Sequence, residues 1–432
     1  MEIDINDLIN NDNIISYNIP KETNGYTASI IGEPNINSEL TVFFATNTYD
    51  QKWYSTKTDR SILVKRLSKL KREWIFVIED KSQLAKSSNY YILVKSVNSF
   101  VENITKTLLK NINKKIIAIT GSVGKTTLAR LLCILLENSQ LIDVKRLTPL
   151  NLADFVFNQL KPTTDYIIAE VGLFYSGQIH QLANILLPYI GIITNIYDMH
   201  IGWNGIKTKS DLLCEKMTLL DKSKIKLISK ELFDRYSLLY SLKNNNVLYN
   251  SSDYQHSINS SSILPKTNVS KNILELIEIT LMKCNKNNFT INEIIKIIQE
   301  NNNVLRFHKY TKNANELFVD SHSSIAGYFQ AMSCHWYESV VLVILSLNFP
   351  SEENINENIS LILKTFPNFK KVLISNKLFR YFGKNEIIKY INAKKFLDEL
   401  LYDDVVIIHD PKAIRLTGKN EKKWKSSISN YI

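Results

Sequence analysis

The sequence predicts an α/β protein of three domains. Short apolar runs alternate with helix-like segments along the 432 residues, which is typical of parallel sheets covered by helices. A glycine-rich loop between one such run and a helix-like segment indicates phosphate chemistry in the middle of the chain. At about 100–200 residues per domain, the length fits two to four domains. We place the domains at residues 1–112, 113–304 and 305–432.

The N-terminal unit is expected to be an α/β substrate-binding domain. Its strands are runs rich in β-branched and aromatic residues, and its helices carry apolar residues at three- and four-residue spacing. The expected elements are a strand at residues 40–45, a helix at 61–71, strands at 74–78 and 90–94, and a helix at 96–109.

The central and C-terminal units repeat this alternation, and because helices separate their buried strands, both predict parallel sheets. The central unit should contain strands at 116–119, 166–169, 189–194 and 225–229, helices at 128–136, 210–220, 271–284 and 291–300, and an exposed serine-rich loop at 250–262. The C-terminal unit should contain strands at 317–320, 340–347, 371–375 and 405–408, a helix ending at 334 and another at 355–364.

The glycine-rich loop is the most informative motif. Such a loop turns successive backbone N–H groups into one concavity, and the dipole of the helix that follows adds positive charge there. Lys125 is placed to reach the outer phosphates of a nucleotide, and the hydroxyl of Thr126 is placed to bind Mg²⁺. We therefore predict a nucleotide-binding site made by Thr120, Gly121, Ser122, Val123, Gly124, Lys125, Thr126 and Thr127.

Composition narrows the classes of function. The net charge is +11, but lysine and asparagine are scattered along the chain, as codon bias in an AT-rich genome would produce, so no nucleic-acid partner is expected. The four cysteines form no Cys-x-x-Cys pair and are expected to be buried, reduced thiols of a cytoplasmic protein. No membrane span is expected, because no uncharged apolar run approaches about 20 residues.

Four further segments accompany the loop in chain order. They are Thr148-Pro149-Leu150-Asn151, Ile-Ile-Ala-Glu-Val-Gly at residues 167–172, the segment 191–205 with Asn195 and His200, and Asn-Val-Ser-Lys-Asn at residues 268–272. Together these segments resemble the Mur ligases, a family of ATP-dependent enzymes that form amide bonds in peptidoglycan precursors. The resemblance implies a central P-loop ATPase-type parallel sheet followed by a Rossmann-like C-terminal domain.

The resemblance also implies roles for individual residues. Glu170 and His200 match the family's ligands of a second Mg²⁺ ion. Lys216 matches a lysine that CO₂ converts into a carbamate, whose oxygens suit that hard cation. Lys207, Lys209 and Lys222 lie nearby, so the sequence leaves the register of this lysine open. Lys125, Glu170, His200 and Lys216 are thus the implied catalytic residues.

Three more residues resemble the family's contacts to the nucleotide. Asn272 is expected to read the adenine ring, while Arg306 and Asp320 are expected to hold the nucleotide from the C-terminal domain. An arginine suits phosphate because its guanidinium presents a fixed fork of donors. Without the resemblance, Arg306 would be interpreted as a surface residue and Asp320 as a turn at a strand end.

The chain departs from the family at both substrate ends. The family's branch that adds D-alanyl-D-alanine has Asp-Ser-Tyr-Asn-Ala-Asn-Pro where residues 320–326 read Asp-Ser-His-Ser-Ser-Ile-Ala. Its Lys-Gly-Ser-Arg segment is replaced by His-Asp-Pro-Lys at residues 409–412. The N-terminal unit lacks the Ser-Arg and Asp-Gly-His patterns that bind a uridine nucleotide sugar. The ATP-binding half is therefore intact, while the substrate-binding segments are altered.

The sequence leaves alternative functions open. The first is an ATP-dependent carboxylate–amine ligase that acts through an acyl phosphate, uses ATP and Mg²⁺, and joins a small carboxylate to an amino acid or dipeptide. The second is the D-alanyl-D-alanine-adding branch itself, and the third is a nucleotide-binding scaffold that has lost catalysis. A P-loop kinase or GTPase is disfavoured, because no guanine-reading Asn-Lys-x-Asp segment is present. By analogy with the family we expect a monomer.

Overall fold

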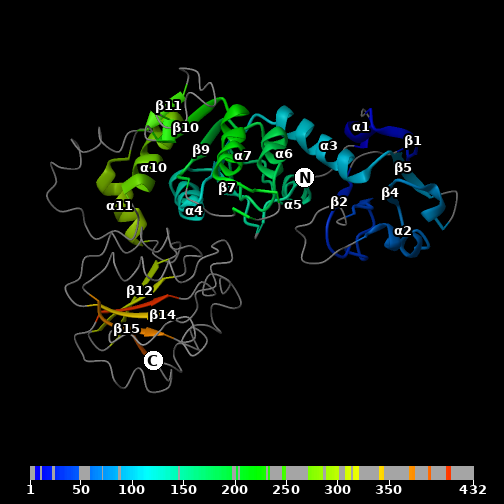
Figure 1. The fold of residues 1–432 in the computed structure, drawn as a ribbon. Helices are drawn as coiled ribbons and strands as arrows, with labels where there is room; N and C mark the ends of the chain where they lie inside the picture. Colours follow the sequence, from blue (N-terminus) through cyan, green and yellow to red (C-terminus); the bar gives the residue numbers. More distant parts are fainter. Residues whose placement is uncertain are drawn as a thin grey trace.

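The computed structural model contains three sheets that follow one another along the chain (Figure 1). It describes residues 5–9, 12–21, 25–47, 59–70, 72–85, 89–144, 146–196, 201–202, 205–229, 232–233, 246–249, 271–285, 289–300, 307–312, 315–320, 340–344, 369–374, 388–390 and 405–409. The sheets confirm the predicted α/β fold class.

The N-terminal sheet has five strands in the order β1-β5-β4-β3-β2, and only the pair β1–β5 is antiparallel. The strands are β1 (Ile14–Asn18), β2 (Thr27–Ser29), β3 (Thr41–Phe44), β4 (Trp74–Ile78) and β5 (Tyr90–Val94). The helices are α1 (Ile5–Ile9), α2 (Ser61–Leu67), the short η1 (Lys81–Gln83) and α3 (Val97–Asn111). Both faces of β4 are buried, as expected for a central parallel strand.

The central sheet is parallel throughout, with six strands in the order β11-β10-β9-β6-β8-β7. Its strands are β6 (Lys115–Thr120), β7 (Ser139–Leu141), β8 (Tyr166–Glu170), β9 (Ile190–Ile193), β10 (Ile225–Ser229) and β11 (Asn246–Tyr249). Its helices are α4 (Lys125–Leu135), α5 (Pro149–Asp154), η2 (Phe155–Gln159), α6 (Gln178–Leu186), α7 (Lys209–Asp221), α10 (Lys271–Lys283) and α11 (Ile291–Glu300). Strand order reverses beside β6, and ligands of open α/β sheets bind at the carboxyl ends of strands at such a point.

The C-terminal sheet has six strands in the order β12-β13-β17-β14-β15-β16, of which only β12 is antiparallel to its neighbour. They are β12 (Phe307–Lys312), β13 (Asn315–Asp320), β14 (Val340–Ile344), β15 (Phe369–Ile374), β16 (Ile388–Tyr390) and β17 (Val405–His409). Asp320 pairs with His409, so the two segments that depart from the family, 320–326 and 409–412, begin side by side at the carboxyl ends of β13 and β17.

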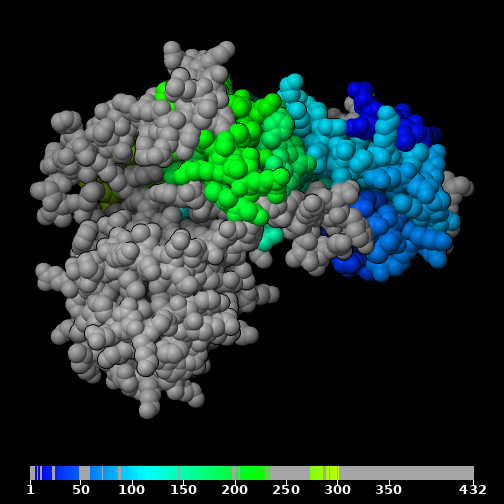
Figure 2. All heavy atoms as spheres, viewed as in Figure 1, coloured from blue at the N-terminus to red at the C-terminus, as the bar shows by residue number. Residues whose placement is uncertain are grey.

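The N-terminal sheet shares an apolar core cluster with the helical segment that follows β7. Leu150, Ala153 and Phe157 of the segment that follows β7 are buried among residues of the N-terminal sheet. The Phe157 ring lies 6.1 Å from the ring of Phe44 at the end of β3. In Figure 2 the cyan and green surfaces of the two domains meet without a break. The predicted boundary at residue 112 falls in the connection between α3 and β6.

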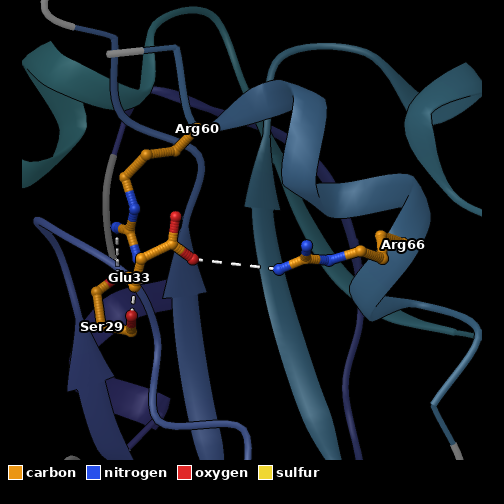
Figure 3. A network of polar contacts seen from close by, with 4 residues as sticks. All are labelled: Ser29, Glu33, Arg60 and Arg66. Carbon is orange, nitrogen blue, oxygen red and sulfur yellow. Dashed lines mark hydrogen bonds and ion pairs between the residues drawn. The ribbon is translucent and has the colours of Figure 1, made fainter.

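Arg60 is a buried cation at the carboxyl edge of the N-terminal sheet (Figure 3). Its guanidinium donates to the carbonyl oxygens of Ser29 (2.7 Å) and Phe44 (2.8 Å) and to the Ser29 hydroxyl (2.6 Å). It also lies 4.3 Å from the centre of the Phe43 ring. Burial lowers the pKa of Arg60 to about 10, against the opposing fields of Asp154 and Glu33. The guanidinium therefore ties the ends of β2 and β3 together.

Replacing Arg60 should destabilise the N-terminal domain strongly. Arg60→Ala leaves two buried carbonyl groups without their donor, and we expect a loss of about 3 kcal/mol in the free energy of unfolding. Arg66→Ala is the matched control, because Arg66 makes an exposed ion pair with Glu33 at 3.8 Å (Figure 3) and should cost less than about 1 kcal/mol. Urea unfolding of both variants measures the difference, and equal losses would contradict the assigned role of Arg60.

Candidate active site

The glycine-rich loop lies at the carboxyl end of β6, in the middle of the central sheet. Gly121 has φ +140°, and a Cβ there would lie 2.0 Å from the Thr194 hydroxyl oxygen. Gly124 has φ +86° and immediately precedes α4, and a Cβ there would lie 2.7 Å from a methyl carbon of Ile273. Both positions thus require glycine, because the backbone is left-handed and the neighbours are close.

The end of β9 holds the loop in shape. The Asn195 side chain accepts from the N–H of Val123 (2.8 Å) and donates to its carbonyl oxygen (3.0 Å). The Thr194 hydroxyl donates to the same carbonyl at 2.6 Å. The N–H of Ser122 donates to the carbonyl of Asn195 at 3.0 Å. The loop is therefore fixed by the adjacent strand, and Asn195 acts here as a brace for the loop.

Thr126 and Glu170 meet at the start of α4. The Thr126 hydroxyl donates to the Glu170 carboxylate at 2.7 Å, although the two residues are 44 positions apart in the chain. Glu170 is the last residue of β8, which pairs directly with β6. The parallel register therefore brings a strand-end carboxylate to the first turn of the helix that follows the loop.

Lys125 folds back over the loop. Its ammonium group donates to the carbonyl oxygens of Gly121 (3.0 Å) and Ser122 (3.2 Å). The side chain is half-buried. This position keeps a positive charge at the N-terminus of α4, where anions are favoured by the backbone N–H groups and by the helix dipole.

Lys216 reaches the same loop from α7. Its side chain is only 1% exposed, and its amine donates to the Ser122 hydroxyl at 2.8 Å. Burial, and then the neighbouring charge of Lys125, hold the pKa of Lys216 well below its ordinary value of 10.5. The other three lysines considered for this role, Lys207, Lys209 and Lys222, are exposed. Of these four lysines, the structure brings Lys216 to the loop, and its carbamylation stays a prediction.

Four predicted site residues are described in part or not at all. His200 and Arg306 lie outside the described residues. Asn272 lies in the first turn of α10, and the residue that follows it, Ile273, packs on the loop at Gly124. Asp320 is the last residue of β13 in the C-terminal sheet. The side chains of Asn272 and Asp320 are not described, so their roles stay predictions.

Sequence reasoning missed the polar contacts that join the neighbouring loops. Gln178 is buried, donates to the carbonyl of Leu147 (3.0 Å) and accepts from the N–H of Phe174 (2.8 Å). Glu215 is buried beside Lys216 and accepts from the Ser176 hydroxyl at 3.2 Å. A polar residue in an amphipathic helix usually faces solvent, so the sequence pattern did not indicate that Gln178 and Glu215 are buried. The only available signal was that each of them lies next to a residue of a recognised motif.

The expectation of buried cysteines was correct for one residue of three. Cys284 is buried, and burial raises the pKa of its thiol to about 11. Cys133 is half-buried and Cys214 is exposed. Cys214 occupies an exposed position of α7, a helix that buries most of its other positions. Cys334 lies outside the described residues.

The described residues fit a magnesium ion bound with a phosphate ligand. Within them, no three residues of the types His, Cys, Asp and Glu gather into a cluster that could hold a metal. Mg²⁺ commonly takes one or two protein oxygens together with substrate phosphates. The Thr126 hydroxyl and the Glu170 carboxylate supply such oxygens directly after the loop, at the start of α4.

Comparison with known proteins agrees with this geometry. Residues 119–292 match the model of the Mur ligase middle domain. This part of the chain is thus similar to a Mur ligase middle domain. The chain is 31% identical over 179 residues to the UDP-N-acetylmuramoyl-tripeptide–D-alanyl-D-alanine ligase of Rickettsia prowazekii, and the match covers 40% of each chain. It is 38% identical over 92 residues to the ligase of the same name from Synechocystis, covering 21% of this chain and 20% of that one.

The fold of the whole chain resembles that of a Mur ligase. The MurF ligase from Thermotoga maritima, solved in complex with ADP, superposes with a TM-score of 0.70 at 14% identity, covering 94% of this chain and 99% of the other. This similarity confirms the multi-domain fold. The sequence matches span less than half the length of the curated relatives. Among the described residues, no helix is long and apolar enough to cross a membrane.

Proposed function

We propose that this protein is an ATP-dependent carboxylate–amine ligase of the Mur ligase type. The observation that carries the proposal is the convergence of Lys125, Thr126, Glu170 and Lys216 on one glycine-rich loop. These residues come from three separate elements, and a phosphate-binding turn of purely structural use would need none of them. The match of residues 119–292 to the Mur ligase middle domain supports the same activity.

The first half-reaction would activate the carboxylate. A carboxylate oxygen attacks the γ-phosphorus of ATP, the bond from that phosphorus to the bridging oxygen breaks, and ADP leaves. Negative charge moves onto the phosphate oxygens, so positioning and electrostatic stabilisation supply the catalysis. Lys125 would release the two loop carbonyls and neutralise the β- and γ-phosphate oxygens, while the loop N–H groups hold the β-phosphate.

In the second half-reaction the amine attacks the acyl carbon of the acyl phosphate. The amine loses a proton, the carbon–oxygen bond breaks and inorganic phosphate leaves. Thr126 would hold the first Mg²⁺ ion, and Glu170 and His200, with carbamylated Lys216, would hold or orient the second. Bound Mg²⁺ would offset the charge that develops on the phosphate oxygens. The chain's own residues align the reactants and exclude water.

A second candidate is the D-alanyl-D-alanine-adding enzyme of peptidoglycan synthesis itself. Four curated relatives carry this name, and the Thermotoga MurF fold covers the N-terminal domain as well. Against it stand the altered segments at 320–326 and 409–412 and an N-terminal unit that lacks the Ser-Arg and Asp-Gly-His patterns for a uridine nucleotide sugar. We therefore propose the broader ligase activity and treat the substrate pair as the quantity to be measured.

Phosphate release tests the proposal. The full chain is incubated with ATP and Mg²⁺, and a panel of UDP-sugar peptides and simple carboxylates is crossed with amino acids and D-alanyl-D-alanine. Phosphate release that requires both a carboxylate and an amine would support the ligase. Release that requires the UDP-sugar tripeptide and D-alanyl-D-alanine would select the second candidate. ATP binding without turnover on any pair would favour the scaffold.

His200 should act through Mg²⁺. His200→Ala is expected to raise the Mg²⁺ concentration for half-maximal phosphate release, because a missing ligand weakens the binding of the ion rather than the binding of the nucleotide. Excess Mg²⁺ should therefore restore part of the lost rate. His180→Ala is the control, since His180 lies on the exposed side of α6. The Mg²⁺ dependence of the initial rate measures the effect, and identical curves for the two variants would contradict the role.

A further inference from the structure

Glu215 is a buried carboxylate between the segments that carry the site. It lies on α7 directly before Lys216 and is 9% exposed. One carboxylate oxygen, Oε1, accepts from the backbone N–H of Gly177 and from the Ser176 hydroxyl at 3.2 Å. The other oxygen, Oε2, is buried without a hydrogen-bond partner in the part of the chain that the structure describes.

The two donors belong to the turn between β8 and α6. Gly177 is the N-cap residue of α6 and has φ +91°, so its N–H belongs to the group of donors that a helix start leaves without backbone partners. Gly177 has no side chain that could cap the N–H groups that follow it, and the Glu215 carboxylate from α7 accepts from the N–H of Gly177 itself. Its negative charge is favourable at the N-terminus of a nine-residue helix.

The same turn also touches the segment that follows β9. A Cβ on Gly205 would lie 3.1 Å from the Cβ of Ser176, so that segment approaches the turn closely. The turn therefore links three parts of the site: the strand that ends at Glu170, the segment after Asn195, and the helix that carries Lys216. The Glu215 side chain holds the turn to that helix through these two hydrogen bonds.

We propose that Glu215 is a positioning residue, which locks the Ser176–Gly177 turn to α7 and so keeps Glu170 aligned with Lys216 across the loop. This inference rests on the proposed ligase function for its kinetic consequence, but its structural part does not. Within the part of the chain that the structure describes, the hydrogen bonds of Glu215 go to the turn and not to the loop that would bind the phosphates, so Glu215 should affect the rate of the chemical step rather than the affinity for ATP.

Three variants separate positioning from simple structural damage. Glu215→Ala removes the acceptor, whereas Glu215→Gln keeps an oxygen that can accept from both donors. Cys214→Ser is the matched control at the exposed neighbouring position of α7. We expect Glu215→Ala to lower kcat on the order of 10²-fold, with the KM for ATP within about 2-fold of the parent value. Glu215→Gln should recover most of kcat.

Two measurements do not depend on turnover. Hydrogen exchange at the Gly177 amide should accelerate in Glu215→Ala and stay slow in Glu215→Gln. The gain in affinity for ADP on adding Mg²⁺ should shrink in Glu215→Ala only, because a displaced Glu170 binds the ion less well. Unchanged exchange, or faster exchange with unchanged kcat and unchanged magnesium coupling, would overturn the role of Glu215. An inactive parent protein would refute the ligase proposal alone, since exchange and magnesium coupling would still decide the role of Glu215.

Discussion

Lys125→Ala should abolish ATP-dependent phosphate release while leaving the fold intact. We expect the Lys125 ammonium to meet the nucleotide phosphates, because it lies over the loop and donates to two carbonyl oxygens of that loop at 3.0 and 3.2 Å. Removing one preorganised charge that acts on a developing anion costs about 10³-fold in rate. The loop itself is braced by Asn195 and Thr194, so its shape should survive the substitution.

Steady-state phosphate release, together with circular dichroism and thermal unfolding, measures this result. Lys110→Ala, which removes an exposed lysine from α3, is the control for lost charge and should retain full activity. Retained turnover in Lys125→Ala would refute the assignment of the loop as the site of chemistry. A collapse of the thermal transition would instead show that Lys125 is needed for folding, and Lys125→Met, which keeps the aliphatic stem, would then repeat the test.

Strands in the interior of the N-terminal and central sheets were predictable because their signal is local. The predicted strands at 74–78, 90–94 and 225–229 match β4, β5 and β10, since each is an apolar run that stands alone between polar segments. The predicted helix start at residue 128 was three residues late, because Gly124 in a left-handed conformation lets the helix begin at Lys125. Its N-cap is a glycine and offers no side-chain signal.

Edge strands and the contacts between elements were not predictable. The strands β1, β2, β7, β11, β12 and β16 are short or half-polar, and their pairing depends on neighbours far away in the sequence. The predicted helices ending at 334 and at 355–364, and the predicted loop at 250–262, lie outside the described residues. The proximity of Thr126 and Glu170 followed from motif resemblance. The hydrogen bonds of Glu215 to the turn before α6 could be seen only once the packing of α6 on α7 was known.

Lys216 should be essential for turnover but costly for stability. An amine that is 1% exposed must lose its hydration, and this burial lowers its pKa, with Lys125 adding repulsion. A neutral amine is the form that can attack CO₂, so the same burial prepares Lys216 for carbamylation. Lys216→Met keeps the length of the side chain, and we expect it to lose about 10²–10³-fold in phosphate release, because one group that binds developing charge is removed. Removing bicarbonate should slow the parent protein reversibly and leave the variant unaffected.

The stability of Lys216→Met gives an independent check with a defined sign. In the parent protein the folded-state pKa of Lys216 lies below its unfolded value of 10.5, so the unfolded chain binds the extra proton. The loss of folding stability caused by burying this amine is therefore largest below the folded-state pKa and disappears as the pH rises towards the unfolded value. Lys216→Met lacks this penalty, so its unfolding midpoint should exceed that of the parent near neutral pH, and the gap should narrow in alkaline buffer. A less stable variant at every pH would contradict a costly buried amine, and full activity without bicarbonate would contradict its carbamylation.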